Sequence, residues 1–253
     1  MKQPIQPLPD GRGSEGVTGL GGVTEPRPLG SGPSWLMRKF LVALALLALL
    51  GGMDANARRR RTRTVNGSFD YYLLSLSWAP DFCAQPNVQQ NERECGTGRH
   101  VGFVVHGLWP QGEEGRGPEN CGQASPVASA IVERMLNYIP SEGLIQHEWK
   151  THGVCTGLAP ANYFAQVRQA FDSLSIPAEY KNLNRQVEVS PNEVESKFAT
   201  ANPGFPAGAF RTSCPGGSLG EVRVCFAKDL KPRACSDSAG ECHMGETAMR
   251  PVR

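Results

Sequence analysis

The sequence predicts an α+β protein with a central antiparallel β-sheet, flanked by several α-helices and stabilised by disulfide bonds. Segments with the two-residue period of strands and segments with the helical period are mixed along the chain without regular βαβ alternation. The chain contains eight cysteines preceded by an export signal, which favours an oxidising compartment in which disulfides persist. Its 253 residues are enough to bury a substantial core.

The first quarter of the chain is expected to lie outside this fold. Residues 1–36 are rich in glycine and proline without periodicity, which indicates a disordered leader or a mis-assigned start. Residues 37–57 combine a basic start, an apolar run too short to span a membrane and an Ala-Asn-Ala site, as in a signal peptide. Residues 58–66 carry arginines typical of a basic flexible terminus. The remaining residues 67–253 contain no repeat or long linker and are predicted to form one domain.

Three segments of this domain have the pattern of strands. Residues 70–78 alternate between two partly apolar sets, as in a strand inside a sheet. Residues 101–106 form a short apolar run followed by Gly-Leu-Trp-Pro, which predicts a buried strand that ends by bringing His106 to the sheet edge. In residues 221–226, apolar side chains alternate with charged side chains and a cysteine, which predicts a half-exposed strand.

Four segments are predicted to be helical. Apolar residues recur at helical spacing over residues 127–136 and 164–174, and a proline follows each segment. Ser190 begins a capping box with proline at the first helical position. Residues 144–152 form the fourth segment, which carries most of the chemistry discussed below.

The charge balance argues against a generally basic surface. The whole chain has 26 Lys and Arg against 24 Asp and Glu, but from residue 64 onward it has 16 basic and 20 acidic residues. This part therefore has a net charge of −4. Nucleic acid would not be attracted here by overall charge.

Two polar segments stand out because they hold three of the five histidines. His106 ends the second predicted strand, and residues 147–155 (HEWKTHGVC) contain the other two, with a glutamate and a cysteine. On a helix, Glu148 and His152 share a face, whereas His147 and His152 diverge by roughly 140°. The zinc-peptidase pattern needs two histidines four residues apart, so this spacing argues against it, and no C-x-x-C pair indicates a structural zinc site. We expect neither a metal nor a cofactor.

Two histidines and a carboxylate in an exported protein suit the cleavage of RNA by phosphoryl transfer to the neighbouring 2′-hydroxyl. This reaction needs a base for the hydroxyl, an acid for the leaving 5′-oxygen, and positive or hydrogen-bonding groups for the phosphorane oxygens. Histidine can serve both proton roles near neutral pH. No metal is required, because the nucleophile already belongs to the substrate.

The segments FVVHGLWPQ and HEWKTHGVC resemble the two active-site segments of the ribonuclease T2 (T-two) family of secreted ribonucleases. The resemblance implies that His152 is the general base and His106 the general acid. It also implies that His147 and Glu148 support the phosphate and the transition state. Trp109 resembles the side chain that stacks on a base, in keeping with aromatic platforms for single-stranded RNA.

The same resemblance, which extends over roughly residues 68–242, implies the pairing of the cysteines. The expected disulfides are Cys83–Cys95, Cys121–Cys155, Cys214–Cys242 and Cys225–Cys235.

The sequence departs from the family pattern at two positions. Thr151 stands where the family has a lysine before the last histidine, and Gln111 stands where fungal members often have an acidic residue. Both are candidate substrate contacts, near the phosphate and the base respectively. Lys150 is a further candidate, but its helical position puts it on the side of His147, so it is not expected to replace the missing ammonium.

The pKa of His152 is expected to be raised. Glu148 lies one helical turn earlier, and Gly153 marks the predicted C-terminus of the helix. A carboxylate and a helix C-terminus both favour the imidazolium form of a nearby histidine.

Other interpretations remain open at this point. A secreted, disulfide-held RNA-binding module could keep the fold without catalysis, although the intact motif histidines argue against it. A metal-dependent hydrolase would be stopped by a chelator. His106 and Trp109 could each be structural core residues, and His100 and His243 are interpreted as surface or structural histidines.

The partners and location follow from the same interpretation. We expect single-stranded RNA as the substrate and no cleavage of DNA, which lacks the nucleophile. We also expect a monomer with no stable membrane insertion after signal removal, located in the periplasm or secreted.

Overall fold

The computed structural model describes residues 68–86, 92–214, 218–240 and 242–252. All of them belong to the compact unit Thr62–Arg253. The predicted leader, signal peptide and basic terminus lie outside the described residues, so they stay predictions. Within the described residues, no helix is both long and apolar enough to cross a lipid bilayer.

A four-stranded antiparallel sheet forms the centre of this unit. Its strands are β1 (Tyr71–Trp78), β2 (Phe103–Gln111), β4 (Phe210–Ser213) and β5 (Glu221–Phe226). They are arranged in the order β2-β1-β5-β4, so β2 is an edge strand. Strand β1 thus pairs with β2 on one side and with β5, from the last part of the chain, on the other.

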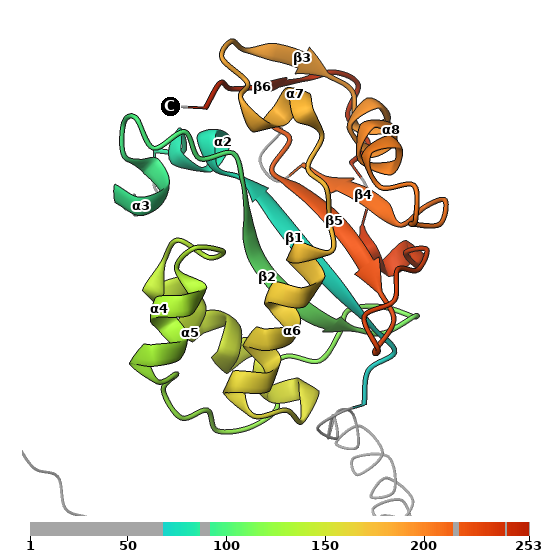
Figure 1. Ribbon diagram of the computed structural model, residues 1–253. Helices are drawn as coiled ribbons and strands as arrows, with labels where there is room; N and C mark the ends of the chain where they lie inside the picture. Colours follow the sequence, from blue (N-terminus) through green and yellow to red (C-terminus); the bar gives the residue numbers. More distant parts are fainter. Residues whose placement is uncertain (1–67, 87–91, 215–217, 241, 253) are drawn as a thin grey trace, which may run out of the picture. The chain divides into compact units, whose positions relative to one another are not determined.

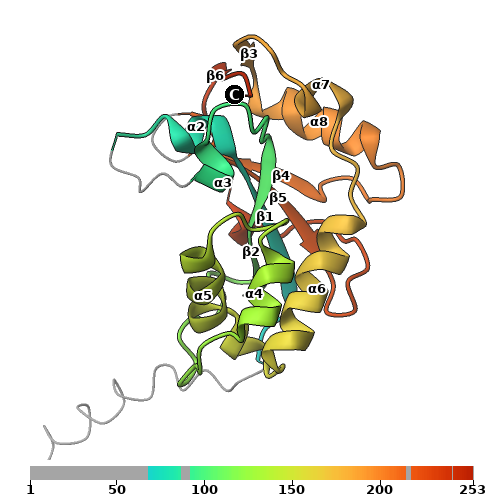
Figure 2. The same ribbon diagram turned by 60° about the vertical axis from the view of Figure 1, so that its left-hand side comes forward.

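Helices surround this sheet. They are α2 (Ala79–Cys83), α3 (Glu92–Cys95), α4 (Ser129–Met135), α5 (Glu142–Thr151), α6 (Pro160–Asp172), α7 (Ala178–Lys181) and α8 (Pro191–Ala201). Figures 1 and 2 show α4, α5 and α6 grouped together, whereas α8 lies near β4. An antiparallel sheet with helices around it confirms the predicted α+β class.

Two helices begin at serine caps. The hydroxyl oxygen of Ser141 accepts a hydrogen bond from the backbone N–H of Leu144, and that of Ser190 accepts one from Glu193, both at 3.2 Å. Each bond satisfies an N–H group that the first helical turn leaves without a partner. The Ser141 cap starts α5 two residues earlier than predicted.

Several short elements were not predicted from the sequence. They are α2, α3, α7, β3 (Val187–Val189), β4 and β6 (Thr247–Met249), and none is longer than five residues. Such lengths are too short for a periodic pattern to emerge. Strands β3 and β6 pair with each other in a separate two-stranded sheet.

The two faces of the main sheet have different roles. On one face, Leu74 of β1 lies between Leu108 of β2 and Val224 of β5, and all three are fully buried. This face belongs to the main core together with α6, where the Tyr163 hydroxyl donates to the carbonyl of Leu108 at 2.9 Å. The other face, called the polar face below, carries polar residues such as Ser75, Glu221 and Arg223 beside a second, small hydrophobic cluster. The cluster contains Tyr71, Leu73, Cys225 and Ala239.

Strand β5 is more buried than predicted. Glu221 and Cys225 are buried on the polar face, and Arg223 is only partly exposed. The segment after β5 folds back over this face, because the disulfide Cys225–Cys235 and a hydrogen bond from Arg223 to the carbonyl of Ala239 hold it there. The prediction of a half-exposed strand was therefore wrong.

A β-bulge interrupts the pairing of β1 and β2. Ser75 lies opposite Gly107 and Leu76 opposite Val105, so His106 is an extra residue without a partner across the strands. Bulges bend a strand locally and change the direction of a side chain. Here the bulge leaves His106 on the polar face.

Strand β2 continues through His106 to Gln111, so the prediction that it ends at the histidine was wrong. Proline cannot donate to a ladder of hydrogen bonds, but Pro110 is tolerated because β2 is an edge strand. Residues three apart on a regular strand face opposite ways, yet His106 and Trp109 lie on the same face because of the bulge.

Four disulfides stabilise the unit. They are Cys83–Cys95, Cys121–Cys155, Cys214–Cys242 and Cys225–Cys235, the pairs that the resemblance implied. Cys121–Cys155 fastens the segment after β2 to the turn that follows α5. It therefore joins the second motif segment to the stretch of chain that follows the first.

The disulfide Cys121–Cys155 closes the longest loop of the four, so it should contribute most to stability. Replacing Cys121 and Cys155 together by alanine opens a loop of 34 residues, which the chain-entropy relation values at about 4 kcal/mol. The matched control, replacement of Cys83 and Cys95, opens a loop of 12 residues and should cost about 3 kcal/mol. Urea unfolding of both variants measures the difference; a larger loss in the control would contradict it.

Candidate active site

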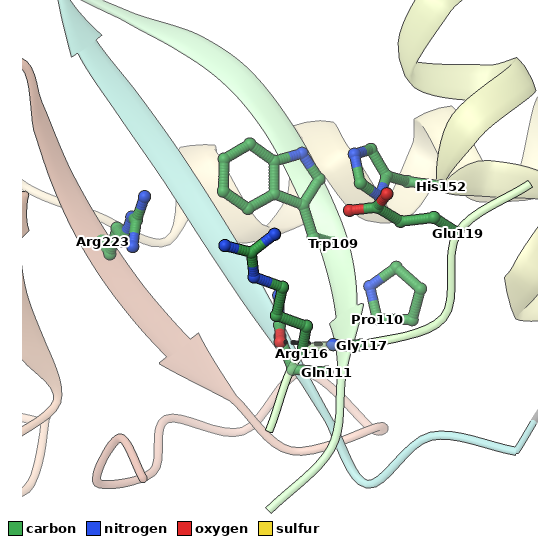
Figure 3. A pocket seen from close by; sticks show the side chains of 8 residues that line it. All are labelled: Trp109, Pro110, Gln111, Arg116, Gly117, Glu119, His152 and Arg223. Atoms are coloured by element: carbon green, nitrogen blue, oxygen red, sulfur yellow. Dashed lines mark hydrogen bonds between the residues drawn. The ribbon is translucent and has the colours of Figure 1, made fainter. Parts of the chain in front are cut away.

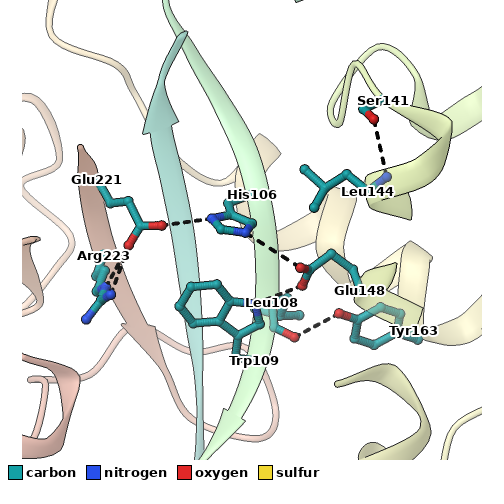
Figure 4. A network of polar contacts seen from close by, with 9 residues as sticks. All are labelled: His106, Leu108, Trp109, Ser141, Leu144, Glu148, Tyr163, Glu221 and Arg223. Carbon is teal, nitrogen blue, oxygen red and sulfur yellow. Dashed lines mark hydrogen bonds and ion pairs between the residues drawn. The ribbon is translucent and has the colours of Figure 1, made fainter. Parts of the chain in front are cut away.

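Strand β2 and helix α5 bring His106, Trp109 and Glu148 together (Figure 4). The indole N–H of Trp109 donates to Oε2 of Glu148 at 2.8 Å, and Oε1 of Glu148 lies 3.7 Å from Nε2 of His106. The centroids of the His106 and Trp109 rings are 5.1 Å apart in an edge-to-face arrangement. Glu148 is 1% exposed, so these two side chains, rather than water, stabilise its charge.

The absence of a side chain at Gly107 makes room for this carboxylate. A Cβ atom at position 107 would collide with Oε2 of Glu148 and with Nε1 of Trp109. The hydrogen bond between these two residues thus passes over the backbone of β2 where only glycine leaves enough space.

Strand β5 supplies the residues on the other side of His106. Nδ1 of His106 lies 2.8 Å from Oε1 of Glu221. Arg223 donates to Oε2 of the same carboxylate from Nε at 3.1 Å and from Nη2 at 2.9 Å. His106 therefore lies between two carboxylates that come from α5 and β5.

The second motif histidine lies at the end of α5. His152 is the C-cap residue of this helix and precedes the short 3₁₀ turn Gly153–Thr156. The centroid of its ring is 5.4 Å from that of Trp109. Trp109 thus packs against both histidines that the sequence motifs predicted to be catalytic.

A cavity of about 270 Å³ opens beside Trp109 and His152 (Figure 3). Its remaining lining residues are Pro110, Gln111, Arg116, Gly117, Glu119 and Arg223. Oε1 of Gln111 accepts a hydrogen bond from the backbone N–H of Gly117 at 2.9 Å, which leaves the amide donors of Gln111 for a ligand. The cavity therefore combines an aromatic surface with charged and amide groups.

A second cavity, of about 160 Å³, adjoins His106. Its lining is mainly apolar and includes Phe82, Val104, Val105 and Leu144. The two histidines thus belong to the walls of two different cavities, with Trp109 in contact with both rings.

The surroundings of His106 favour its charged form. Burial lowers the pKa of His106, but the hydrogen bond to Glu221 and the negative charges of Glu148 and Glu221 outweigh it, so the pKa is raised. Burial raises the pKa of Glu148 to about 7, although His106 and the hydrogen bond from Trp109 oppose this shift. The charge of each of these two groups thus favours the charged form of the other.

The surroundings of His152 have the opposite effect. Burial lowers the pKa of His152 to about 4, and the neighbouring His147 and His106 add to the shift. The prediction of a raised pKa was therefore wrong. Its physical reason is that the Glu148 carboxylate interacts with Trp109 and His106 rather than with the His152 ring.

Three of the four other predicted substrate contacts line neither of these cavities. His147 and Lys150 are exposed, whereas Thr151 is buried at 9% exposure. None of the three lines either cavity in the part of the chain that the structure describes. Gln111 is the one member of this set that lines the larger cavity.

Four polar residues near the site were not predicted from the sequence. They are Arg116, Glu119, Glu221 and Arg223. A glutamate and an arginine two apart on an otherwise apolar strand were a usable signal, because both must then face the same way. Arg116 and Glu119 lie in a loop without periodicity, where no comparable signal exists.

Among the residues that the structure describes, no group of three or more His, Cys, Asp and Glu side chains is placed to hold a metal ion.

The close approach at Gly107 can be tested by adding one methyl group. Gly107→Ala must displace the carboxylate of Glu148 or the indole of Trp109, and overpacking of this kind costs about 1–3 kcal/mol. We expect a lower midpoint of thermal unfolding and a lower pKa of His106, measured by NMR titration of its ring.

Gly204→Ala is the matched control, because a Cβ at that position meets nothing within 4 Å. Its unfolding midpoint and the His106 titration should remain as in the unchanged protein. Equal behaviour of the two variants would mean that the space above Gly107 is not needed.

Comparison with known proteins finds relatives over most of the chain. The sequence model of the Ribonuclease T2 family matches residues 69–235. A protein from Aeromonas hydrophila named "Ribonuclease" is 34% identical over 227 residues, which cover 86% of this chain and 100% of that protein. A "Probable ribonuclease" from Haemophilus influenzae is 29% identical over 178 residues, covering 66% of this chain and 61% of that protein.

Solved structures show the same fold. An RNase-related protein from Calystegia sepium matches with a TM-score of 0.57 and 21% identity, covering 73% of this chain and 98% of that one. Trichomaglin, described as an S-like ribonuclease, matches with a TM-score of 0.56 and 20% identity, covering 73% and 99%. Together with the family match over most of the described residues, these findings show that the chain belongs to the ribonuclease T2 family.

Proposed function

We propose that the protein is an endoribonuclease that cleaves single-stranded RNA by transphosphorylation and leaves 2′,3′-cyclic phosphate ends. The observation that carries this proposal is the placement of His106 and His152 against the same indole ring. Two histidines on either side of one bound phosphate can serve as base and acid in a single displacement. Relatives named as ribonucleases support the choice of substrate.

The proposed reaction assigns one proton transfer to each histidine. Neutral His152 accepts the proton of the 2′-hydroxyl while the 2′-oxygen forms a bond to phosphorus. Charged His106 donates a proton to the 5′-oxygen as its bond to phosphorus breaks. The lowered pKa of His152 and the raised pKa of His106 both favour these starting forms.

The carboxylate of Glu148 supports two residues, the acid His106 and the neighbouring Trp109. It accepts the indole hydrogen bond that fixes Trp109, and its charge favours protonated His106. The resemblance also assigns it, with His147, to the phosphate. In our proposal its main effect passes through Trp109 and His106, because the buried carboxylate is in contact with these two.

The cavities offer places for the bases on both sides of the cleaved bond. Trp109 provides an aromatic surface on the larger cavity, where stacking is tolerant of base identity. Arg116 and Arg223, on the same wall, bring positive charge to a site whose family lysine is replaced by the buried Thr151. An unstacked single strand would fit this arrangement better than a duplex.

The remaining parts of the proposal concern compartment and assembly. Four disulfides support a periplasmic or extracellular location, since such bonds persist in oxidising surroundings. We propose that the protein acts as a monomer, because elements of one chain supply both histidines and both carboxylates.

A dinucleotide experiment tests this function. Purified protein should convert a ribodinucleotide to a 2′,3′-cyclic phosphate and leave its 2′-deoxy analogue intact, equally with and without EDTA. His106→Ala and His152→Ala should each lower kcat by about 10²–10⁴-fold, whereas the exposed His243→Ala serves as a control. Binding of RNA without any cleavage would instead favour the RNA-binding module, and loss of activity in EDTA the metal-dependent hydrolase.

The pH dependence of kcat/KM provides a further test. As pH falls through about 4, His152 takes up a proton and can no longer act as base, so the rate should fall. As pH rises through the raised pKa of His106, the acid is lost and the rate should fall again. We expect a bell with its acidic limb near pH 4. An acidic limb near the ordinary histidine value would contradict a lowered pKa of His152.

A further inference from the structure

We infer that Glu221 is a positioning residue for His106: its carboxylate holds the proton on Nδ1 and so leaves Nε2 as the nitrogen that delivers the reacting proton, while Arg223 holds the carboxylate. This inference rests on the proposed function, in which His106 is the acid. Neither residue belongs to the two sequence motifs, and both come from a strand more than 100 positions later in the chain.

The hydrogen bond between His106 and Glu221 decides which ring nitrogen carries the fixed proton. Burial raises the pKa of Glu221, but its bonds and charge interactions with His106 and Arg223 outweigh this, so the pKa is lowered and the carboxylate is ionised. An ionised carboxylate can only accept hydrogen bonds. Nδ1 of His106, at 2.8 Å, must therefore be the donor, which leaves Nε2 as the nitrogen that exchanges its proton.

Arg223 restricts Glu221 to this arrangement. Its Nε and Nη2 both donate to Oε2, so Oε1 remains for the histidine (Figure 4). Its third nitrogen, Nη1, donates to the carbonyl of Ala239 at 2.7 Å. The guanidinium also lies 5.7 Å from the centre of the Trp109 ring, so one arginine links the histidine's partner to the aromatic wall.

The segment after β5 has a backbone suited to this contact. Gly240 adopts a positive φ of 77°, and a Cβ atom there would approach Nη1 of Arg223 to 2.8 Å. Glycine therefore allows the chain to turn while its neighbour Ala239 accepts the arginine hydrogen bond. The disulfide Cys225–Cys235 ties the same segment to β5.

Titratable groups approach His106 from three elements. Glu148 and His152 approach from α5, Glu221 and Arg223 from β5, and Glu94 of α3 lines the same cavity as His106. Among these, Glu221 is the group that hydrogen-bonds the ring directly, whereas Glu148 lies at 3.7 Å. Removing the charge of Glu221 alone should thus have the larger effect on the ring tautomer.

Glu221→Gln is a sharp test because the amide fits the site in only one favourable orientation. Its oxygen must face the donors of Arg223, so its NH₂ group faces Nδ1 of His106 and donates to it. The histidine then places its proton on Nε2 when neutral, and the imidazolium loses an acceptor. The alkaline limb of kcat/KM should move to lower pH by about 1–3 units, and kcat should fall by between about 10- and 10⁴-fold.

The experiment compares the full chain with Glu221→Gln, Glu221→Asp and Glu188→Gln. Glu188, exposed on β3, loses the same charge away from the site and should leave the pH profile unchanged. Glu221→Asp retains the carboxylate and should retain most of the alkaline limb, and it remains informative if the glutamine variant does not fold. Ring ¹⁵N shifts of His106 should report Nδ1–H in the unchanged protein and Nε2–H in Glu221→Gln.

The outcomes separate this inference from the proposed function. If the unchanged protein cleaves no RNA, the proposed function fails. If it cleaves RNA but Glu221→Gln moves neither the alkaline limb nor the His106 tautomer and only lowers the unfolding midpoint, Glu221 is merely structural and the inference is overturned. A shifted limb together with the changed tautomer supports it.

Discussion

The extra residue in β2 is the constraint on which the site depends. On a regular strand, His106 and Trp109 would point to opposite faces, and Leu108 would leave the core. With the bulge, Leu108 stays buried beneath α6 while the histidine and the tryptophan share the polar face. Gly107, at the bulge, then leaves the gap through which Glu148 reaches both side chains. Core packing and site geometry are thus fixed by the same local irregularity.

Sequence patterns predicted the elements that are long and periodic. The segments around α4 and α6 have the apolar spacing that defines helices, α8 has a capping box, and β1 has the alternation of a central strand. The end of β2 was misjudged because a histidine followed by glycine interrupts the alternation, and a bulge produces the same pattern as a strand end. The disulfide pairs came from family resemblance, since eight cysteines allow many pairings.

The sequence predicted the motif residues of the candidate site but neither their contacts nor the residues that β5 adds. Helical spacing placed Glu148 on the face of His152, and this led to the wrong sign for the pKa of that histidine. The carboxylate is held instead by the Trp109 indole from another strand, a long-range contact that no spacing rule contains. Glu221 is further still from the motifs, and its role depends on strand order, which brings β5 next to β1. Burial and tertiary contacts, rather than local sequence, decide which histidine is charged.

The opposite charge preferences of the two histidines also bear on what happens after cleavage. In the proposed mechanism, the product complex holds the proton on His152 and none on His106, which is the distribution that the surrounding groups disfavour. Hydrolysis of the cyclic phosphate would start from this reversed distribution, because acid and base exchange roles. Proton exchange with solvent restores the resting distribution. In this mechanism, the electrostatics would therefore bias the enzyme toward release of the cyclic product, and the chain-breaking step would be the one for which the site is prepared.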